Sequence, residues 1–444
     1  MTIQLVEQLK TLDQKHFLHP TSSIEEQQKY GPAAIFCEGK GIYLKDLEGN
    51  TYIDGMSSLW NVNVGHGRTE IAEVAKEQME KLAFSSCFAT FSNEPAIKLA
   101  AKIAELTPGD LNTVFFTSGG SESNDTAIKL ARHYWILKGQ PNRQKIISRS
   151  LSYHGLAYGS TNATGIEGFR KFTNSPAPDF HYVDKDSPEE LRRLIEELGP
   201  EKVAAFISEP VQGAGGVNLP KPDYFQKVRE ICDEYGVLFI ADEVITGFGR
   251  TGKNFGIEHF GVVPDMMTFA KGVSSGYAQL GGVIISEKIH KDFCELSKGI
   301  LMHGYTYSGH PTACAVGLKN LEIIEREGLV QNAKIMGEEM LKGFQALQQK
   351  YDFIGDVRTF GLLGAIGLVK NRETGELFDP LLSPIAVQEM TKRGLILRTV
   401  TYGQDTIVFS PPLIITKNEL NEMLRIVDET FAYLQKEIIG NGVK

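Results

Sequence analysis

Two charged residues end strongly apolar segments of the chain, where a buried charge needs an explanation. Lys271 follows the run MMTFA, and Asp242 follows the run LFIA. A buried lysine is costly, but its amine can form a Schiff base with a carbonyl compound. An aspartate at the carboxyl end of a strand in an open α/β sheet can hold the protonated nitrogen of a heterocycle, which then withdraws electrons.

Each of these residues also has a simpler interpretation. Lys271 taken alone suits a lysine that extends from a strand end to the surface. Asp242 taken alone suits a helix cap or an ion pair. Two charged residues that each end a core strand of one sheet are much less easily unrelated, so together they favour a site for a flat ring that acts as an electron sink.

A glycine-rich segment and an aromatic segment could complete such a site. In FFTSGGSESND a strand runs into Gly119, Gly120 and Ser121 before a helix. Glycines let backbone N–H groups approach an anion, and a helix N-terminus favours a phosphate. In SLSYHGLAYGS, Tyr153 precedes His154, and its ring could lie against a flat ring. Taken alone, the first segment also suits an ordinary helix cap, and the second a core tyrosine beside a loop histidine.

Short apolar strands separated by helices must position these residues. Strands are predicted in TVFFT, VAAFISEP, GVLFIADEV, DMMTFAKG and GGVIIS, and helices in EIAEVAKEQMEKL and AIKLAAKIAEL. This alternation is typical of crossover connections in a buried sheet. The sequence therefore predicts an α/β fold whose large domain has a mostly parallel sheet flanked by helices.

The two ends of the chain are expected to form a smaller α+β domain. Strands are predicted around IFCEGKGIYLKDLEGNTYIDG, with a turn at residues 49–50. A long helix is predicted near Pro311, and helices then alternate with strands such as FGLLGAIGLV. The predicted domains are an N-terminal part of the small domain at 1–60, the large domain at 61–328 and the rest of the small domain at 329–444.

The composition excludes several classes of protein. Of the 444 residues, 42% are hydrophobic and 23% charged, which is typical of globular proteins with a large core. The net charge of −9 and the lack of a dense basic run argue against a nucleic-acid binder. The N-terminal segment lacks an apolar export core, no later run suits a membrane span, and the five cysteines show no metal-ligand spacing. We therefore expect a soluble cytoplasmic protein with reduced thiols and no bound metal.

Taken together, these segments resemble the class III aminotransferases, a fold type I family that depends on pyridoxal phosphate. DEVITGFGRTG followed by PDMMTFAKGVSSG is similar to the signature block of the family in content and spacing. SEPVQGAGG, YHG, HGYTYSGHP and the SGGSE loop occur in the family's order. The resemblance spans residues 39 to 412.

The resemblance implies a role for each of these residues. Lys271 would carry pyridoxal 5′-phosphate as a Schiff base and shuttle a proton, and Asp242 would pair with the pyridine nitrogen. Val244 would pack on the ring face opposite Tyr153, and Glu209 would support the hydroxyl side of the ring. The residues expected to bind the cofactor are Gly119, Gly120, Ser121, Tyr153, His154, Glu209, Asp242, Val244, Lys271, Tyr305 and Thr306.

The same resemblance implies an assembly of at least two copies. Gly120 and Ser121 would hold the phosphate within one chain. Thr306, with Tyr305 beside it, would reach the phosphate of the neighbouring subunit. The family forms homodimers with shared active sites, so a homodimer or a dimer of dimers is expected.

GMSSLWNVNVGHGR and GLILRTV look most like the subgroup that transfers terminal amines to pyruvate. In that subgroup Trp60, Phe88 and Tyr153 would line the substrate pocket. Arg398 would bind the carboxylate of the keto acid through its planar guanidinium and move aside for an uncharged donor. Considered alone, Arg398 also suits a surface arginine near a strand end.

The phosphate loop departs from the family pattern at one position. Gly119 replaces a small polar residue, which removes a potential hydrogen bond worth about 1 kcal/mol. The cofactor is therefore expected to bind somewhat less tightly.

Two alternatives to transamination stay open on sequence grounds. An aminomutase or a decarboxylase on the same fold would use the same lysine and aspartate. A non-catalytic scaffold protein would be expected to lack Lys271 or Asp242, and both are present. The physiological amine donor is not predicted.

Overall fold

The computed structural model describes residues 3–172 and 176–440. A seven-stranded sheet in the order β4-β10-β9-β8-β7-β5-β6 forms the centre of its larger part. The strands of this sheet are β4 Leu111–Thr117, β5 Lys145–Arg149, β6 Phe180–Val183, β7 Val203–Ser208, β8 Leu238–Asp242, β9 Met266–Phe269 and β10 Gly281–Ser286. Strands β5 to β9 pair in parallel, and β10 is antiparallel to both β4 and β9. The predicted mostly parallel sheet is confirmed.

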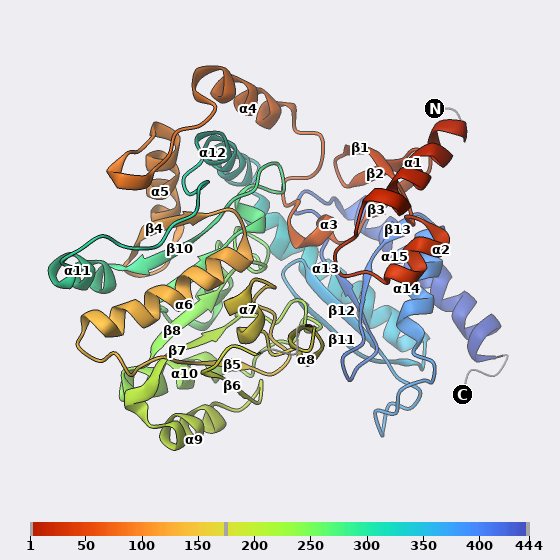
Figure 1. Ribbon diagram of the computed structural model, residues 1–444. Coiled ribbons are helices and arrows are strands. Elements are labelled where there is room, and N and C mark those ends of the chain that lie inside the picture. The colour runs from red at the N-terminus through yellow and green to blue at the C-terminus, as the bar shows by residue number, and fades with distance from the viewer. Residues whose placement is uncertain (1–2, 173–175, 441–444) are drawn as a thin grey trace.

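Helices cover both faces of this sheet (Figure 1). Every residue of β7, β8, β9 and β10 is buried, which explains the nearly uninterrupted apolar runs. Helix α6 begins at Gly120, directly after β4, and packs along β10 and β9. The helices of this part are α4 Thr69–Leu82, α5 Glu94–Leu106, α6 Gly120–Leu137, α7 Tyr158–Ala163, α8 Glu167–Arg170, α9 Pro188–Leu198, α10 Tyr224–Tyr235, α11 Glu287–Leu296 and α12 Pro311–Arg326, with 3₁₀ turns at Phe88–Thr90, Pro200–Lys202, Gly256–Phe260 and Lys271–Val273.

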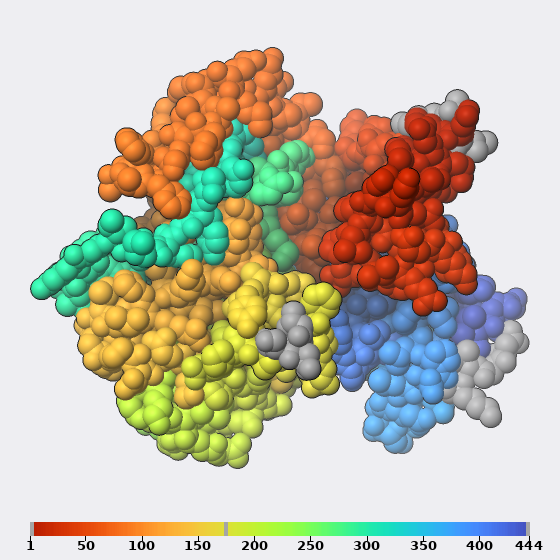
Figure 2. Space-filling view, viewed as in Figure 1, coloured from red at the N-terminus to blue at the C-terminus, as the bar shows by residue number. Residues whose placement is uncertain are grey.

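Two smaller sheets bring the ends of the chain together. The antiparallel sheet β11-β12-β15-β14 is C-terminal, whereas the sheet β1-β2-β3-β13 joins N-terminal strands to a C-terminal one. Their strands are β1 Phe36–Lys40, β2 Tyr43–Asp46, β3 Thr51–Asp54, β11 Ile354–Phe360, β12 Leu363–Leu368, β13 Leu395–Ile396, β14 Arg398–Val400 and β15 Thr406–Phe409. Strand β13 pairs in parallel with β3. Figure 2 shows the red N-terminal segment against the blue C-terminal segment on one side of the molecule.

Helices accompany these sheets at both ends of the chain. They are α1 Ile3–His16, α2 Ile24–Tyr30, α3 Ser57–Trp60, α13 Leu329–Lys350, α14 Leu382–Lys392 and α15 Lys417–Tyr433, followed by a π-helical turn at Leu434–Ile439. The architecture is thus the expected α/β fold with a smaller α+β part built from both termini. The domain boundaries at 60/61 and 328/329 stay predictions. In the described ranges we find no helix with the length and apolarity needed to span a membrane.

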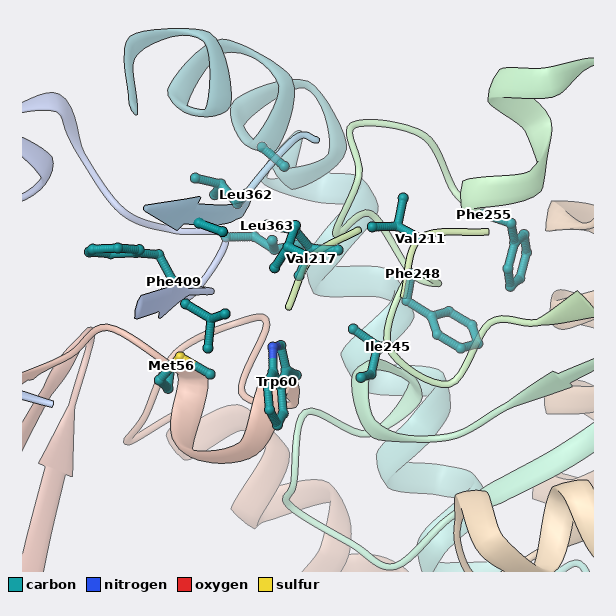
Figure 3. Close-up of a cluster of buried hydrophobic side chains, with 14 of the residues drawn as sticks. Met56, Trp60, Val211, Val217, Ile245, Phe248, Phe255, Leu362, Leu363 and Phe409 are labelled. Atoms are coloured by element: carbon teal, nitrogen blue, oxygen red, sulfur yellow. The ribbon is translucent and has the colours of Figure 1, made fainter. Parts of the chain in front are cut away.

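One hydrophobic core connects the two parts of the molecule. Figure 3 shows Trp60 between Met56 on one side and Ile245 on the other, with Phe409 of β15 nearby. Ile245 follows β8 of the large sheet, whereas Met56 and Trp60 follow β3. The N-terminal segment around Trp60 therefore lies where the large sheet meets the C-terminal strands.

Candidate active site

A cavity of about 100 Å³ lies at one edge of the seven-stranded sheet. It is lined by Gly120, Ser121, Asn124, Tyr153, His154, Gly155, Glu209, Asp242, Val244, Ile245 and Lys271. The structure thus brings most of the predicted cofactor residues together. Gly119 lines an adjoining hollow of about 270 Å³ that shares Gly120 and Lys271 with the cavity.

The topology explains why these residues meet. Tyr153 follows β5, Glu209 follows β7, Asp242 ends β8 and Lys271 follows β9. These strands are neighbours and run in parallel, so their carboxyl ends lie at the same edge of the sheet. Residues that are far apart in the sequence therefore meet at this site because their strands are parallel neighbours.

Asp242 is a buried carboxylate with a full set of donors. One of its oxygens accepts hydrogen bonds from Nδ1 of His154 at 2.7 Å and from the amide of Asn124 at 2.8 Å. The other oxygen accepts the backbone N–H of Val244 at 3.0 Å. Burial opposes its ionisation, but the hydrogen bond and charge of His154, with these other donors, hold the pKa of Asp242 below its usual range. This carboxylate is therefore charged at neutral pH.

Lys271 lies in an uncommon backbone conformation, with φ at +44°, directly after Ala270 at the end of β9. Its amine makes no hydrogen bond or ion pair with the residues that the structure describes. Burial lowers the pKa of Lys271, while the charges of Asp242 and Glu209 oppose that shift. A strained lysine with a free amine and a lowered pKa suits a nucleophile or a proton carrier.

Two tightly packed glycines, one at the start of α6 and one beside Ser121, fit a phosphate group. A Cβ on Gly120 would lie 2.8 Å from Cγ1 of Val244, and a Cβ on Gly155 would lie 2.4 Å from Oγ of Ser121. A side chain at either position would force its neighbours to shift, and the N–H groups of residues 120–122 make no hydrogen bond to the residues that the structure describes, so they can face an anion. A buried carboxylate for a ring nitrogen, a free amine and an anion cradle therefore suit pyridoxal phosphate.

Comparison with known proteins defines the family. The family model for aminotransferase class-III matches residues 25–431. The chain belongs to the class III aminotransferases. These enzymes depend on pyridoxal phosphate, which is therefore the cofactor, and the protein is an enzyme of amino transfer.

Several relatives of this aminotransferase match along almost their whole length. A putrescine–pyruvate aminotransferase of Pseudomonas aeruginosa is 38% identical over 95% of this chain and 96% of its own. The crystal structure of a transaminase from the marine bacterium Virgibacillus is 53% identical, with a TM-score of 0.96 over 97% of this chain and 100% of its own. An omega transaminase from Pseudomonas jessenii, solved in complex with PMP, is 35% identical, with a TM-score of 0.93 over 98% and 100% of the two chains.

Asn124 is a site residue of this aminotransferase that the sequence did not reveal. Its amide nitrogen donates to Asp242 and also to the carbonyl oxygen of His154 at 2.7 Å. Its amide oxygen accepts the hydroxyl of Thr268 at 2.9 Å. Asn124 lies one turn into the helix that follows the glycine-rich loop, so its position relative to that loop is the signal that could have found it.

Trp60 and Arg398, both predicted to bind substrate, lie together near the cavity. The guanidinium carbon of Arg398 lies 5.8 Å from the centre of the Trp60 ring. Arg398 makes no hydrogen bond or ion pair with the described residues. Its positive charge acts on both Lys271 and Tyr153, so the guanidinium is close enough to influence the site.

An aromatic cluster beside Tyr153 was also missed. The rings of Phe169 and Tyr153 pack edge to face, with their centres 5.4 Å apart. The centre of the Tyr402 ring lies 6.2 Å from that of Phe169. Tyr402 is in the turn between β14 and β15, four residues after Arg398. Neither Phe169 nor Tyr402 belongs to a recognisable motif, so the sequence alone does not mark them as residues beside the site.

Phe88, Tyr305 and Thr306 do not reach the cavity within one chain. Phe88 is 51% exposed, and a Cβ on Gly304 would lie 2.8 Å from its ring. Thr306 is exposed, and the hydroxyl of Tyr305 donates to the carbonyl of Glu122 at 3.4 Å. None of the three lines the cavity, so the predicted roles of Phe88, Tyr305 and Thr306 stay predictions.

Gly119 provides a test of phosphate binding. Its φ of 177° suits any residue, and a Cβ there would meet nothing within 4 Å. Gly119→Ser is expected to add a hydrogen bond to the phosphate worth about 1 kcal/mol, which tightens cofactor binding about fivefold. Equilibrium dialysis of pyridoxal phosphate against the apoenzyme measures this change. Gly120→Ser serves as the contrast and should weaken binding, because its Cβ would collide with Val244; equal effects of the two variants would contradict the cradle.

The charge of Glu209 provides a test of the Lys271 amine. Burial raises the pKa of Glu209 to about 7, so above that pH its charge raises the pKa of Lys271. Glu209→Gln removes the charge, so the amine should become neutral at a lower pH. Since only a neutral amine attacks an aldehyde, the rate at which the apoenzyme captures pyridoxal phosphate should rise at a lower pH in the variant. The exposed Glu167→Gln variant should leave the profile in place, and an unshifted profile in Glu209→Gln would contradict the coupling.

Proposed function

We propose that this aminotransferase moves an amino group from a primary amine or an ω-amino acid to pyruvate. The observation that carries the proposal is the guanidinium of Arg398, which lies beside Trp60 without a partner among the described residues and influences Lys271. A free guanidinium near the reacting amine suits the carboxylate of a keto acid. The relative from Pseudomonas aeruginosa that is named for putrescine and pyruvate supports pyruvate as the acceptor.

The side chains of the cavity divide the chemistry between them. Pyridoxal phosphate, when bound, supplies an electron sink for the substrate carbon that loses its proton. The neutral amine of Lys271 takes that proton and later returns it. Asp242, charged and held by His154 and Asn124, keeps a ring nitrogen protonated. Tyr153 provides an aromatic face at the cavity wall.

A panel of donors and acceptors tests the proposal. Beta-alanine, taurine, putrescine and an aryl-alkyl amine are each paired with pyruvate and with 2-oxoglutarate. We expect pyruvate to support at least about tenfold higher kcat/KM than 2-oxoglutarate, and double-reciprocal plots to give parallel lines, because the two substrates react in turn. Preference for 2-oxoglutarate with every donor would refute the proposed acceptor.

Arg398→Ala is expected to act on the acceptor half of the reaction. Loss of a bidentate, charge-assisted interaction costs about 1.5–3 kcal/mol, so kcat/KM for pyruvate should fall about 10- to 100-fold. With an aliphatic aldehyde as acceptor, which lacks the carboxylate, kcat/KM should fall much less in the same variant. Arg398→Lys keeps the charge but lacks the planar guanidinium. Its kcat/KM for pyruvate should lie between that of the parent enzyme and that of Arg398→Ala. Equal losses with pyruvate and the aldehyde would show that Arg398 does not bind the carboxylate.

The assembly is proposed to be a homodimer or a dimer of dimers in which Thr306 and Phe88 complete the site of the neighbouring subunit. A groove of about 790 Å³ that includes Phe88 also contains the exposed side chains of Ile300 and Met302. Exposed apolar surface of this kind is typical of an interface. We further place the enzyme in the cytoplasm, which the five free cysteines support. Sedimentation of the holoenzyme as a monomer would contradict the shared site.

A further inference from the structure

The loop that carries Trp60 has an unusual backbone. We call residues 54–66 the Trp60 loop. Ser57, Ser58 and Trp60 all have φ between 45° and 59°, in the left-handed region. Residues other than glycine rarely adopt this conformation, and for a bulky residue such as tryptophan it is a clear outlier. The surrounding structure must therefore hold the loop in place.

Asp54 holds the loop from its N-terminal end. This carboxylate is completely buried and accepts the backbone N–H of Ser58 at 2.8 Å and that of Met56 at 3.3 Å. It also accepts the Ser58 hydroxyl at 3.2 Å and Nε2 of His66 at 2.8 Å. A single side chain thus connects the start of the loop, its left-handed turn and its end.

Arg250 also holds the loop, through Ser57 and Asn63. Its guanidinium is completely buried and donates to Oγ of Ser57 at 3.1 Å and to Oδ1 of Asn63 at 2.7 Å. The guanidinium also donates to the carbonyl of Pro411 at 2.5 Å. The hydroxyl of Ser57 in turn donates to the carbonyl of Ser410 at 2.7 Å. All of these hydrogen-bond acceptors are neutral, and the buried charge of Arg250 is opposed by that of Asp54.

The contacts of Asn63 connect this network to the catalytic lysine. Its amide nitrogen donates to the carbonyl of Phe248 at 3.0 Å. A Cβ on Gly272, the residue after Lys271, would lie 2.5 Å from that same nitrogen. The Trp60 loop therefore packs directly against the segment that carries the reacting amine.

We propose that Arg250 and Asp54 are positioning residues that fix Trp60 beneath Arg398 and thereby set the selectivity for the amine donor. Trp60 is buried between Met56 and Ile245, and its ring lies 5.8 Å from the Arg398 guanidinium carbon (Figure 3). If the loop relaxed from its left-handed turn, the ring would leave this place. The selectivity part of the inference rests on the proposed function and on the predicted contact between Trp60 and the substrate.

The fluorescence of Trp60 reports its position independently of activity. The chain has two tryptophans, so Trp135→Phe leaves Trp60 as the sole emitter. In that background, Arg250→Met of the holoenzyme is expected to shift the emission to longer wavelength, because the indole becomes exposed. Arg250→Lys should give a smaller shift. Unchanged emission in Arg250→Met would overturn the inference, whatever the kinetics show.

Kinetics with two donors of different size test the selectivity. The ratio of kcat/KM for 1-phenylethylamine to that for 2-aminobutane should change about tenfold in Arg250→Met, with cofactor content unchanged. Arg143 offers a matched control, since this buried arginine donates to the carbonyls of Gly236 and Tyr235 instead. Arg143→Met should lower Tm and keep the ratio. A lowered Tm with an unchanged ratio in Arg250→Met, in a protein whose ratio does change in Trp60→Ala, would reduce Arg250 to a structural role and overturn the selectivity part of the inference.

Two further variants separate this inference from the proposed function. Trp60→Ala should change the donor ratio directly; an unchanged ratio there would refute the substrate contact of Trp60, while the emission shift in Arg250→Met still decides whether Arg250 positions the ring. If Arg250→Met does not fold, Ser57→Ala removes one link of the same network. The emission should then move in the same direction by a smaller amount, and a fixed emission would overturn the inference.

Discussion

Lys271→Ala is expected to lower kcat by about 10⁴-fold or more and to remove the absorbance band of the covalently held cofactor. Lys271 supplies the one amine among the residues that line the cavity. In the proposed mechanism its loss removes both the covalent anchor and the proton carrier, and acid–base catalysis alone contributes about 10²- to 10⁴-fold. Turnover of the best donor with pyruvate and an absorbance spectrum of the purified variant measure the two effects.

Small primary amines provide a sharper version of this test. Added methylamine should restore part of the activity of Lys271→Ala, because it can carry the proton from the same place. The exposed Lys291→Ala variant on α11 is the control and should retain full activity. Substantial turnover in Lys271→Ala without added amine would contradict the role of this lysine.

Asp242→Asn is expected to lower kcat by about 10²- to 10³-fold while the protein stays folded. The substitution keeps the size of the side chain but removes the buried charge, and the expected loss corresponds to about 3–4 kcal/mol of transition-state stabilisation. An uncharged amide cannot hold a ring nitrogen in its protonated form. The measurement is kcat at saturating donor and pyruvate, with cofactor content determined for each sample.

A matched carboxylate separates catalysis from stability. Asp265 pairs with Arg229 at 2.8 Å just before β9 and does not line the cavity. Asp265→Asn should lower the free energy of unfolding and leave kcat within about twofold of the parent. If Asp242→Asn behaved like this control, the carboxylate of Asp242 would have no part in the chemistry.

Much of the large sheet could be predicted because burial leaves a direct mark on the sequence. Strands covered on both faces need uninterrupted apolar runs, so β7 to β10 can be predicted from the sequence. The polar residues at the strand ends indicate the edge of the sheet where a ligand would bind. The antiparallel direction of β10 could not be predicted from the sequence. GGVIIS would read the same in either direction, since only the connections and the pairing partners decide it.

The missed residues act through contacts between distant parts of the chain. Asn124 donates to Asp242 across 118 residues, and no periodicity records such a pair. The left-handed turn at Trp60 contradicts local preference, because Asp54 and Arg250 impose it from outside. Arg250 itself lay within a recognised motif, but its acceptors on the Trp60 loop and near β15 could be known only from the structure.

The placement of Phe88 and Thr306 shows a different limit. The resemblance assigns both residues to the active site, yet within one chain they lie on the surface and do not line the cavity. A motif reports that a residue takes part in a site, but it does not report which copy of the chain supplies it. These two assignments stay predictions, which the proposed assembly would satisfy.

Reduction of the holoenzyme with borohydride, followed by peptide mass mapping, tests most directly whether Lys271 holds the cofactor at this edge of the sheet. The reduction makes the link between the lysine and the cofactor permanent, so the modified peptide identifies the residue. We predict a single pyridoxyl group, on Lys271, and no such group after the same treatment of Lys271→Ala. A pyridoxyl group on any other lysine, with Lys271 unmodified, would contradict the assignment.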